Sequence, residues 1–87
     1  MICLIVKGKV QGVFFRDFTK QMAAKFNITG YVRNLANGDV EIFARGDENS
    51  LKMFEDAVQR GSPSSRVDSV EKKLLNDQLF DGFEIRY

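Results

Sequence analysis

The order of elements in this chain is set by its central stretch, TGYVRNLANGDVEIFAR, residues 29–45. Residues 29–35 and residues 39–45 each have the composition of a β-strand, and apolar side chains alternate along the second at Val40, Ile42 and Ala44. Between these two segments, Asn37-Gly38 is the dipeptide most typical of a type I′ hairpin turn. The stretch therefore predicts two antiparallel strands joined by a tight turn.

An amphipathic helix is expected on each side of this hairpin. Residues 17–26 carry apolar side chains at helical spacing, namely Phe18, Met22, Ala23 and Phe26. Asp47 has a side chain suited to an N-cap, and a second apolar stripe follows it at Leu51, Phe54, Ala57 and Val58. The run Gly61-Ser62-Pro63 is expected to end this second helix.

Strands are expected at both ends of the chain. Residues 2–7 predict a strand that is buried on both faces and stops at Gly8, residues 67–75 predict a fourth strand, and residues 83–87 predict a short terminal one. The order βαββαβ with an extra strand indicates a single α+β domain over residues 1–87, a ferredoxin-like sandwich with two helices on one face of an antiparallel sheet. This fold serves many functions, so it decides none.

The composition of the chain restricts which functions are possible. Thirteen Lys and Arg against twelve Asp and Glu give a net charge of +1, which offers no broad surface for nucleic acid or an anionic membrane. Cys3 is the only cysteine, so no internal disulfide can form, and no stretch resembles a signal peptide or a membrane span. We expect a cytoplasmic monomer. The chain has no histidine, so its chemistry must proceed without imidazole.

A candidate anion site lies between the first strand and the first helix, in the loop GKVQGVFFR, residues 8–16. Amides at a helix N-terminus lack partners and carry the positive end of the helix dipole. Gly12 allows close approach of the backbone, and Arg16 adds a planar donor pair that matches phosphate. A glycine turn beside a solvated arginine is the alternative explanation. The Lys-Ser or Lys-Thr of a P-loop and the arginine of a cysteine phosphatase loop are both missing.

Two segments together resemble a known family. GKVQGVFFR resembles the first signature of the acylphosphatases, and GYVRNLANGDVEIFARG, residues 30–46, resembles their second. A helix separates the two as in that family, and GSPSSRVDSV, residues 61–70, is similar to the family's segment after the second helix. Many members have Gly where this chain has Phe14, but bulkier residues also occur there, and a backbone amide does not depend on its side chain.

The resemblance implies roles for particular residues. Arg16 corresponds to the phosphate-binding arginine, and Asn34 to the asparagine that positions the attacking water. The backbone amides of five loop residues would complete the phosphate cradle, namely Gln11, Gly12, Val13, Phe14 and Phe15. Taken by itself, Asn34 is also explained as a polar residue at a strand end, and without the resemblance it could not be preferred over Asn37.

The implied activity is hydrolysis of an acyl phosphate to a carboxylate and inorganic phosphate, with no cofactor or metal ion. Inorganic phosphate would be both product and competitive inhibitor. The departing carboxylate has a conjugate acid with a pKa of about 4, so it needs no general acid. The protein has only to hold the phosphate and place one water in line, and a phosphate oxygen of the substrate can accept the water's proton.

A non-catalytic ferredoxin-like module, either RNA-binding or anion-sensing, is the alternative function. An RNA-recognition domain needs an aromatic platform on its third strand, where this chain has the poorly suited segment DVEIF, residues 39–43. An anion-sensing module would not require Arg16 and Asn34 together. The spacing of the phenylalanines predicts core positions for Phe18, Phe26, Phe43, Phe54 and Phe83, and Lys72-Lys73 is expected on a solvated strand face.

Overall fold

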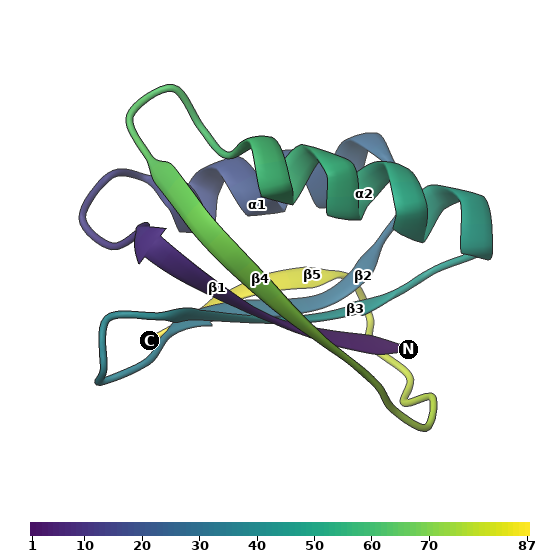
Figure 1. Ribbon diagram of the computed structural model, residues 1–87. Coiled ribbons are helices and arrows are strands. Elements are labelled where there is room, and N and C mark those ends of the chain that lie inside the picture. Colours follow the sequence, from purple (N-terminus) through teal and green to yellow (C-terminus); the bar gives the residue numbers. More distant parts are fainter.

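Five β-strands and two α-helices form the computed structural model, which describes residues 1–87 (Figure 1). The predicted order of elements is confirmed. The elements are β1 (Ile2–Lys9), α1 (Phe15–Lys25), β2 (Thr29–Asn34), β3 (Val40–Arg45), α2 (Glu48–Arg60), β4 (Arg66–Leu74) and β5 (Phe83–Arg86). Neither helix is long and apolar enough to cross a lipid bilayer.

The strands form one sheet in the order β4-β1-β3-β2-β5. β1 pairs antiparallel with β3 and β4, and β2 pairs antiparallel with β3. Both helices cover the same face of this sheet (Figure 1). The ferredoxin-like fold is thereby confirmed, with one detail that was not predicted: β5 runs parallel to β2, so the sheet is mixed.

Strand direction brings three strand ends to one edge of the sheet. β1 and β2 are both antiparallel to β3, so they run the same way, and β5 runs with them. Lys9, Asn34 and Arg86 are the last residues of these three strands. In Figure 1 the loop after β1, the tip of the β2–β3 hairpin and the C-terminus accordingly lie on the same side of the molecule. The loop predicted to bind an anion therefore lies beside the end of β2.

The core lies between the sheet and the helices. Alternate residues of the central strands point into it, so that Val6, Val32 and Ile42 are fully buried. The helices contribute the two largest buried side chains, Phe15 from α1 and Phe54 from α2. Burying an aromatic or aliphatic side chain of this size contributes about 1.5–3 kcal/mol each, so this layer holds α1 and α2 on the sheet.

One phenylalanine predicted in the core lies elsewhere. Phe54 is buried, and Phe18, Phe26 and Phe83 pack against the core. Phe43 instead points to the opposite face of the sheet, because its β3 neighbours Ile42 and Ala44 face the helices. There its ring stacks on Tyr31, with 4.7 Å between ring centroids. The prediction for Phe43 was wrong, because the alternation of Val40, Ile42 and Ala44 already places Phe43 on the other face of the strand.

The hairpin turn also differs from the prediction. A type I′ turn needs positive φ at both central residues, but of Asn37 and Gly38 only Gly38 has one, at 96°. The amide of Gly38 donates to the carbonyl of Leu35 at 3.2 Å, and the amide of Leu35 donates to the carbonyl of Asp39 at 2.8 Å. The turn is thus wider than a two-residue hairpin, and β2 ends at Asn34 rather than at Leu35.

The predicted ends of α2 are confirmed. The Asp47 carboxylate accepts a hydrogen bond from the Ser50 amide at 2.9 Å, and this bond holds the pKa of Asp47 below its usual value. Gly61 follows the last turn with φ of 74°. On β4, Lys72 and Lys73 are exposed as expected, and Lys72 pairs with Glu55 at 3.0 Å.

Candidate active site

The helix that carries Arg16 begins earlier than the apolar spacing indicated. Its first residue is Phe15, not Asp17, and its N-cap is Phe14. Phe14 has left-handed backbone angles, φ of 60° and ψ of 25°, and no side chain caps the helix. Arg16 therefore lies in the first turn of α1, where unpaired amides and the positive end of the helix dipole are concentrated.

The loop amides before α1 have no partners within the protein. The backbone hydrogen bonds of turns, loops and caps include none donated by residues 11–15, and no side chain accepts from these amides. Of the five residues predicted to supply amides, Gly12, Phe14 and Phe15 border a cavity at this end of the sheet, whereas Gln11 and Val13 do not. The structure thus places three of the five at one hollow.

The side chain of Gln11 links the loop to the hairpin. Its Nε2 donates to the carbonyl of Leu35 and to that of Asp39, both at 2.8 Å. These two carbonyls belong to the turn that follows β2. The bonds tie the loop after β1 to the hairpin and so hold it next to Asn34, the residue that precedes Leu35.

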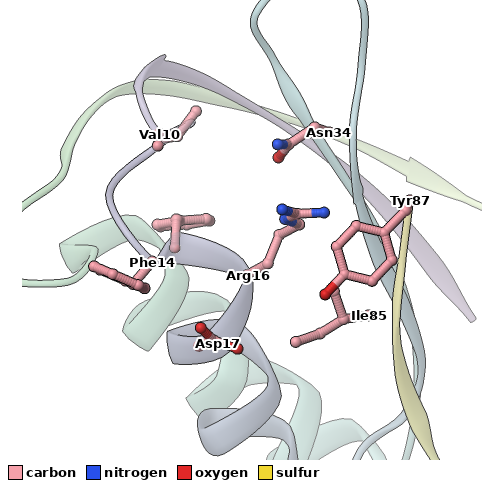
Figure 2. A pocket seen from close by; sticks show the side chains of 9 residues that line it. Val10, Phe14, Arg16, Asp17, Asn34, Ile85 and Tyr87 are labelled. Carbon is pink, nitrogen blue, oxygen red and sulfur yellow. The ribbon is translucent and has the colours of Figure 1, made fainter.

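The C-terminal end of the chain restrains the Arg16 side chain. Its Nη1 donates to the carbonyl of Arg86 at 3.3 Å, and its Cζ lies 4.5 Å from the centre of the Tyr87 ring (Figure 2). No acidic side chain pairs with Arg16, since none of the seven ion pairs includes it. Its remaining N–H donors are therefore available to a bound anion.

Asn34 lines the same cavity. It is the last residue of β2, opposite Val40 of β3, and its side chain points toward Arg16 in Figure 2. Its Oδ1 is buried and has no hydrogen-bond partner. An unpaired buried acceptor costs about 1–3 kcal/mol. The Nδ2 of Asn34 also makes no hydrogen bond within the protein, but it is not enclosed in this way, so it can donate a hydrogen bond to a small molecule in the cavity.

The cavity has a volume of about 370 Å³. Its lining contains both residues singled out from the sequence for side-chain roles, Arg16 and Asn34. Sequence reasoning gave no role to four other lining residues, Val10, Asp17, Ile85 and Tyr87. Ile85 lies in β5 and Tyr87 follows it, and no local pattern indicates that this strand pairs with β2. Cys3 is not part of the lining, and burial raises the pKa of its thiol.

The family model for acylphosphatases matches residues 2–85, almost the whole chain. This chain belongs to the acylphosphatase family. An acylphosphatase from Dehalococcoides mccartyi strain CBDB1 is 51% identical over 74 residues, which cover 82% of this chain and 81% of that protein. An acylphosphatase from Bacillus licheniformis is 49% identical over 93% of this chain and 88% of its own length.

Solved acylphosphatase structures agree with this assignment. The crystal structure of the acylphosphatase from Bacillus subtilis matches with a TM-score of 0.95 and 40% identity, over 99% of this chain and 97% of that one. The family and the enzyme class predicted from the two signatures are thereby confirmed. The roles of individual residues rest on the geometry described above.

Phe14 is the residue of the site whose backbone least suits its side chain. A left-handed conformation costs a non-glycine residue about 1–2 kcal/mol, and the Phe14 side chain is 81% exposed, so little burial offsets this cost. Glycine adopts the conformation freely and is also a better N-cap than an apolar residue.

We predict that Phe14→Gly raises the free energy of unfolding by about 0.5–1 kcal/mol, after subtracting the greater chain entropy of glycine. Phe14→Ala is the matched control, because it removes the ring but keeps a Cβ in the left-handed conformation. Urea denaturation of the three proteins measures the difference. If Phe14→Gly were no more stable than Phe14→Ala, the strain assigned to this position would be wrong.

Proposed function

We propose that this member of the acylphosphatase family hydrolyses acyl phosphates by direct attack of water, with Arg16 and the loop amides holding the phosphate and Asn34 positioning the water. The observation that carries this proposal is the shared cavity at the N-terminus of α1. An arginine without an acidic partner and an asparagine whose amide nitrogen makes no hydrogen bond within the protein both border it. The two groups are complementary to a phosphate and to a water molecule.

Phosphate binding follows from the start of α1. Its unpaired amides and helix dipole favour an oxyanion, and the Arg16 guanidinium adds parallel N–H donors. The carbonyl of Arg86 and the ring of Tyr87 limit the movement of that guanidinium. A preorganised set of donors stabilises the charge that spreads over the phosphoryl oxygens in the transition state.

Asn34 is proposed to position the attacking water. Its Nδ2 donates a hydrogen bond to the water oxygen, which holds the water in line with phosphorus and leaves a second lone pair of that oxygen free for attack. The water oxygen forms a bond to phosphorus as the bond from phosphorus to the acyl oxygen breaks, and the carboxylate leaves with the electron pair. A phosphoryl oxygen takes the water's proton. No side-chain acid or base is required, since the leaving group is a weak base with a conjugate-acid pKa of about 4.

Turnover of benzoyl phosphate tests this proposal directly. We predict release of inorganic phosphate that is unchanged by excess EDTA, because the guanidinium and the amides supply the positive charge that a metal ion would otherwise provide. The alternative, a non-catalytic anion-binding module, predicts phosphate binding without turnover. Activity that is lost in EDTA and restored by a divalent cation would contradict metal-independent hydrolysis.

Inorganic phosphate is expected to inhibit competitively. It presents the same oxygens to the α1 N-terminus as the phosphoryl group of the substrate, so the two cannot bind together. Initial rates at several phosphate concentrations should show a rising KM for benzoyl phosphate at constant kcat. A falling kcat at constant KM would place the phosphate site outside this cavity.

Arg16→Lys tests the guanidinium. An ammonium keeps the charge but cannot present two parallel donors to phosphate, so we predict that kcat/KM falls by at least roughly 100-fold. Arg60→Lys, the same change at the exposed end of α2, is the control and should retain wild-type kinetics. The thermal midpoint of each variant checks that it is folded. Near-normal kinetics in folded Arg16→Lys would remove Arg16 from the site.

Asn34→Ala separates positioning of the water from binding of the phosphate. We predict that kcat falls roughly 100- to 1,000-fold, or about 2.7–4 kcal/mol, while the inhibition constant of phosphate changes little. Asn34→Asp should not rescue the rate, because a carboxylate offers no N–H donor and adds negative charge beside an anionic phosphate.

Asn37→Ala is the matched control, since Asn37 lies in the same hairpin but is exposed and bonds only to Asp39. It should keep wild-type kcat. A fully active but less stable Asn34→Ala would identify Asn34 as a structural strand-end residue and contradict its catalytic role.

A further inference from the structure

A second hollow lies next to the proposed phosphate site, on the other side of the α1 N-terminus. It has a volume of about 240 Å³ and lies between the start of α1 and the loop after α2. Apolar side chains make up part of its lining, namely Val13, Phe14, Phe18 and Pro63. We name it the acyl groove. Phe14 and Asp17 border both the acyl groove and the larger cavity, so the two hollows adjoin.

The geometry of in-line attack places the acyl group of the substrate toward this groove. In an in-line displacement the leaving oxygen departs from the side of phosphorus opposite the attacking water. If the water is held by Asn34, the acyl group must extend away from Asn34. Figure 2 shows Asn34 and Phe14 on opposite sides of the cavity, with the Arg16 side chain next to Asn34 and Tyr87.

We propose, on the basis of the proposed function, that the acyl group lies in the acyl groove and that the Phe14 ring selects acyl phosphates with aromatic or bulky apolar acyl groups. Phe14 is well placed for this contact. Its ring is 81% exposed, so it has little packing within the protein and offers its surface to a ligand. A methyl group such as that of acetyl phosphate is too small to cover it.

Charge at the groove favours the same substrates. Asp17 borders both hollows and has no ion-pair partner. An acyl group with its own carboxylate or phosphate would be repelled by this side chain. No basic residue lines the groove to offset that repulsion. An uncharged apolar acyl group meets no such penalty.

The test compares benzoyl phosphate with acetyl phosphate. The selectivity is the ratio of the kcat/KM value for benzoyl phosphate to that for acetyl phosphate. The two substrates differ in intrinsic reactivity, but this difference is the same for every variant, so it cancels when the ratios of two variants are compared. In Phe14→Ala we expect this ratio to fall roughly 2- to 10-fold, mainly through a higher KM for benzoyl phosphate, because the lost contact is present before and during reaction. Phe14→Tyr keeps an aromatic ring and should keep the ratio.

Tyr87→Ala is the matched control. It removes an exposed aromatic ring from the C-terminal side of the same cavity and loosens Arg16, which both substrates need. It should lower both kcat/KM values together and leave their ratio unchanged. A ratio that falls in Tyr87→Ala but not in Phe14→Ala would place the acyl group at the C-terminal strand and overturn the inference. An unchanged ratio in Phe14→Ala would also overturn it.

Failure of the proposed function gives a different result. If the wild-type protein hydrolyses neither substrate, the catalytic assignment fails, and the acyl groove fails with it. If both substrates are hydrolysed and their ratio is insensitive to Phe14, the hydrolase activity stands and only the groove is wrong. The wild-type rates and the Phe14→Ala ratio therefore distinguish the two failures.

Discussion

Antiparallel pairing of β3 with both β1 and β2 is the constraint on which the site depends. Two strands that are antiparallel to a common neighbour run the same way, so the ends of β1 and β2 meet at one edge of the sheet. The loop that leads into α1 follows β1, and Asn34 ends β2. The helix start proposed to bind the phosphate and the amide proposed to position the water therefore come together, although they are far apart in the sequence. The Gln11 side chain then fixes the loop to the hairpin through two carbonyls.

Donor groups of positive character are concentrated at the start of α1 in a protein that is nearly neutral, although Asp17 also borders the cavity. The net charge is only +1, but partial charges on the unpaired amides and the full charge of Arg16 are concentrated at one helix terminus. Arg16 has no acidic partner to neutralise it, and its contacts are instead a carbonyl and an aromatic ring. These contacts orient the guanidinium without cancelling its charge. The local field is therefore suited to a small anion and not to a polyanion.

Several residues of the site depart from the usual local preferences of backbone conformation, hydrogen bonding and helix capping. Phe14 has a backbone conformation that favours glycine, Asn34 buries an unpaired oxygen, and the first turn of α1 has no side-chain cap. Each feature lowers stability by an amount comparable to a single hydrogen bond, and the packed layer between the sheet and the helices offsets it. Exceptions of this kind are expected at a functional site, because groups that are satisfied within the protein have no capacity left for a ligand.

Local structure was determined by the sequence itself. The elements and their order follow from the spacing of apolar residues, from Asp47 at the start of α2 and from Gly61 at its end. Each of these signals acts on the backbone within a few residues of its own position. The same locality places Arg16 at a helix start, and the two signatures in combination indicated the family. Asn34, by contrast, could be preferred over Asn37 only through that resemblance.

Other features were decided by the tertiary structure alone. They include the parallel pairing of β5, which brings Ile85 and Tyr87 to the cavity, and the bonds of Gln11 to the hairpin. All of them join segments far apart in the chain. Their positions depend on strand pairing and on packing against the helices, and no local pattern of residues encodes that pairing.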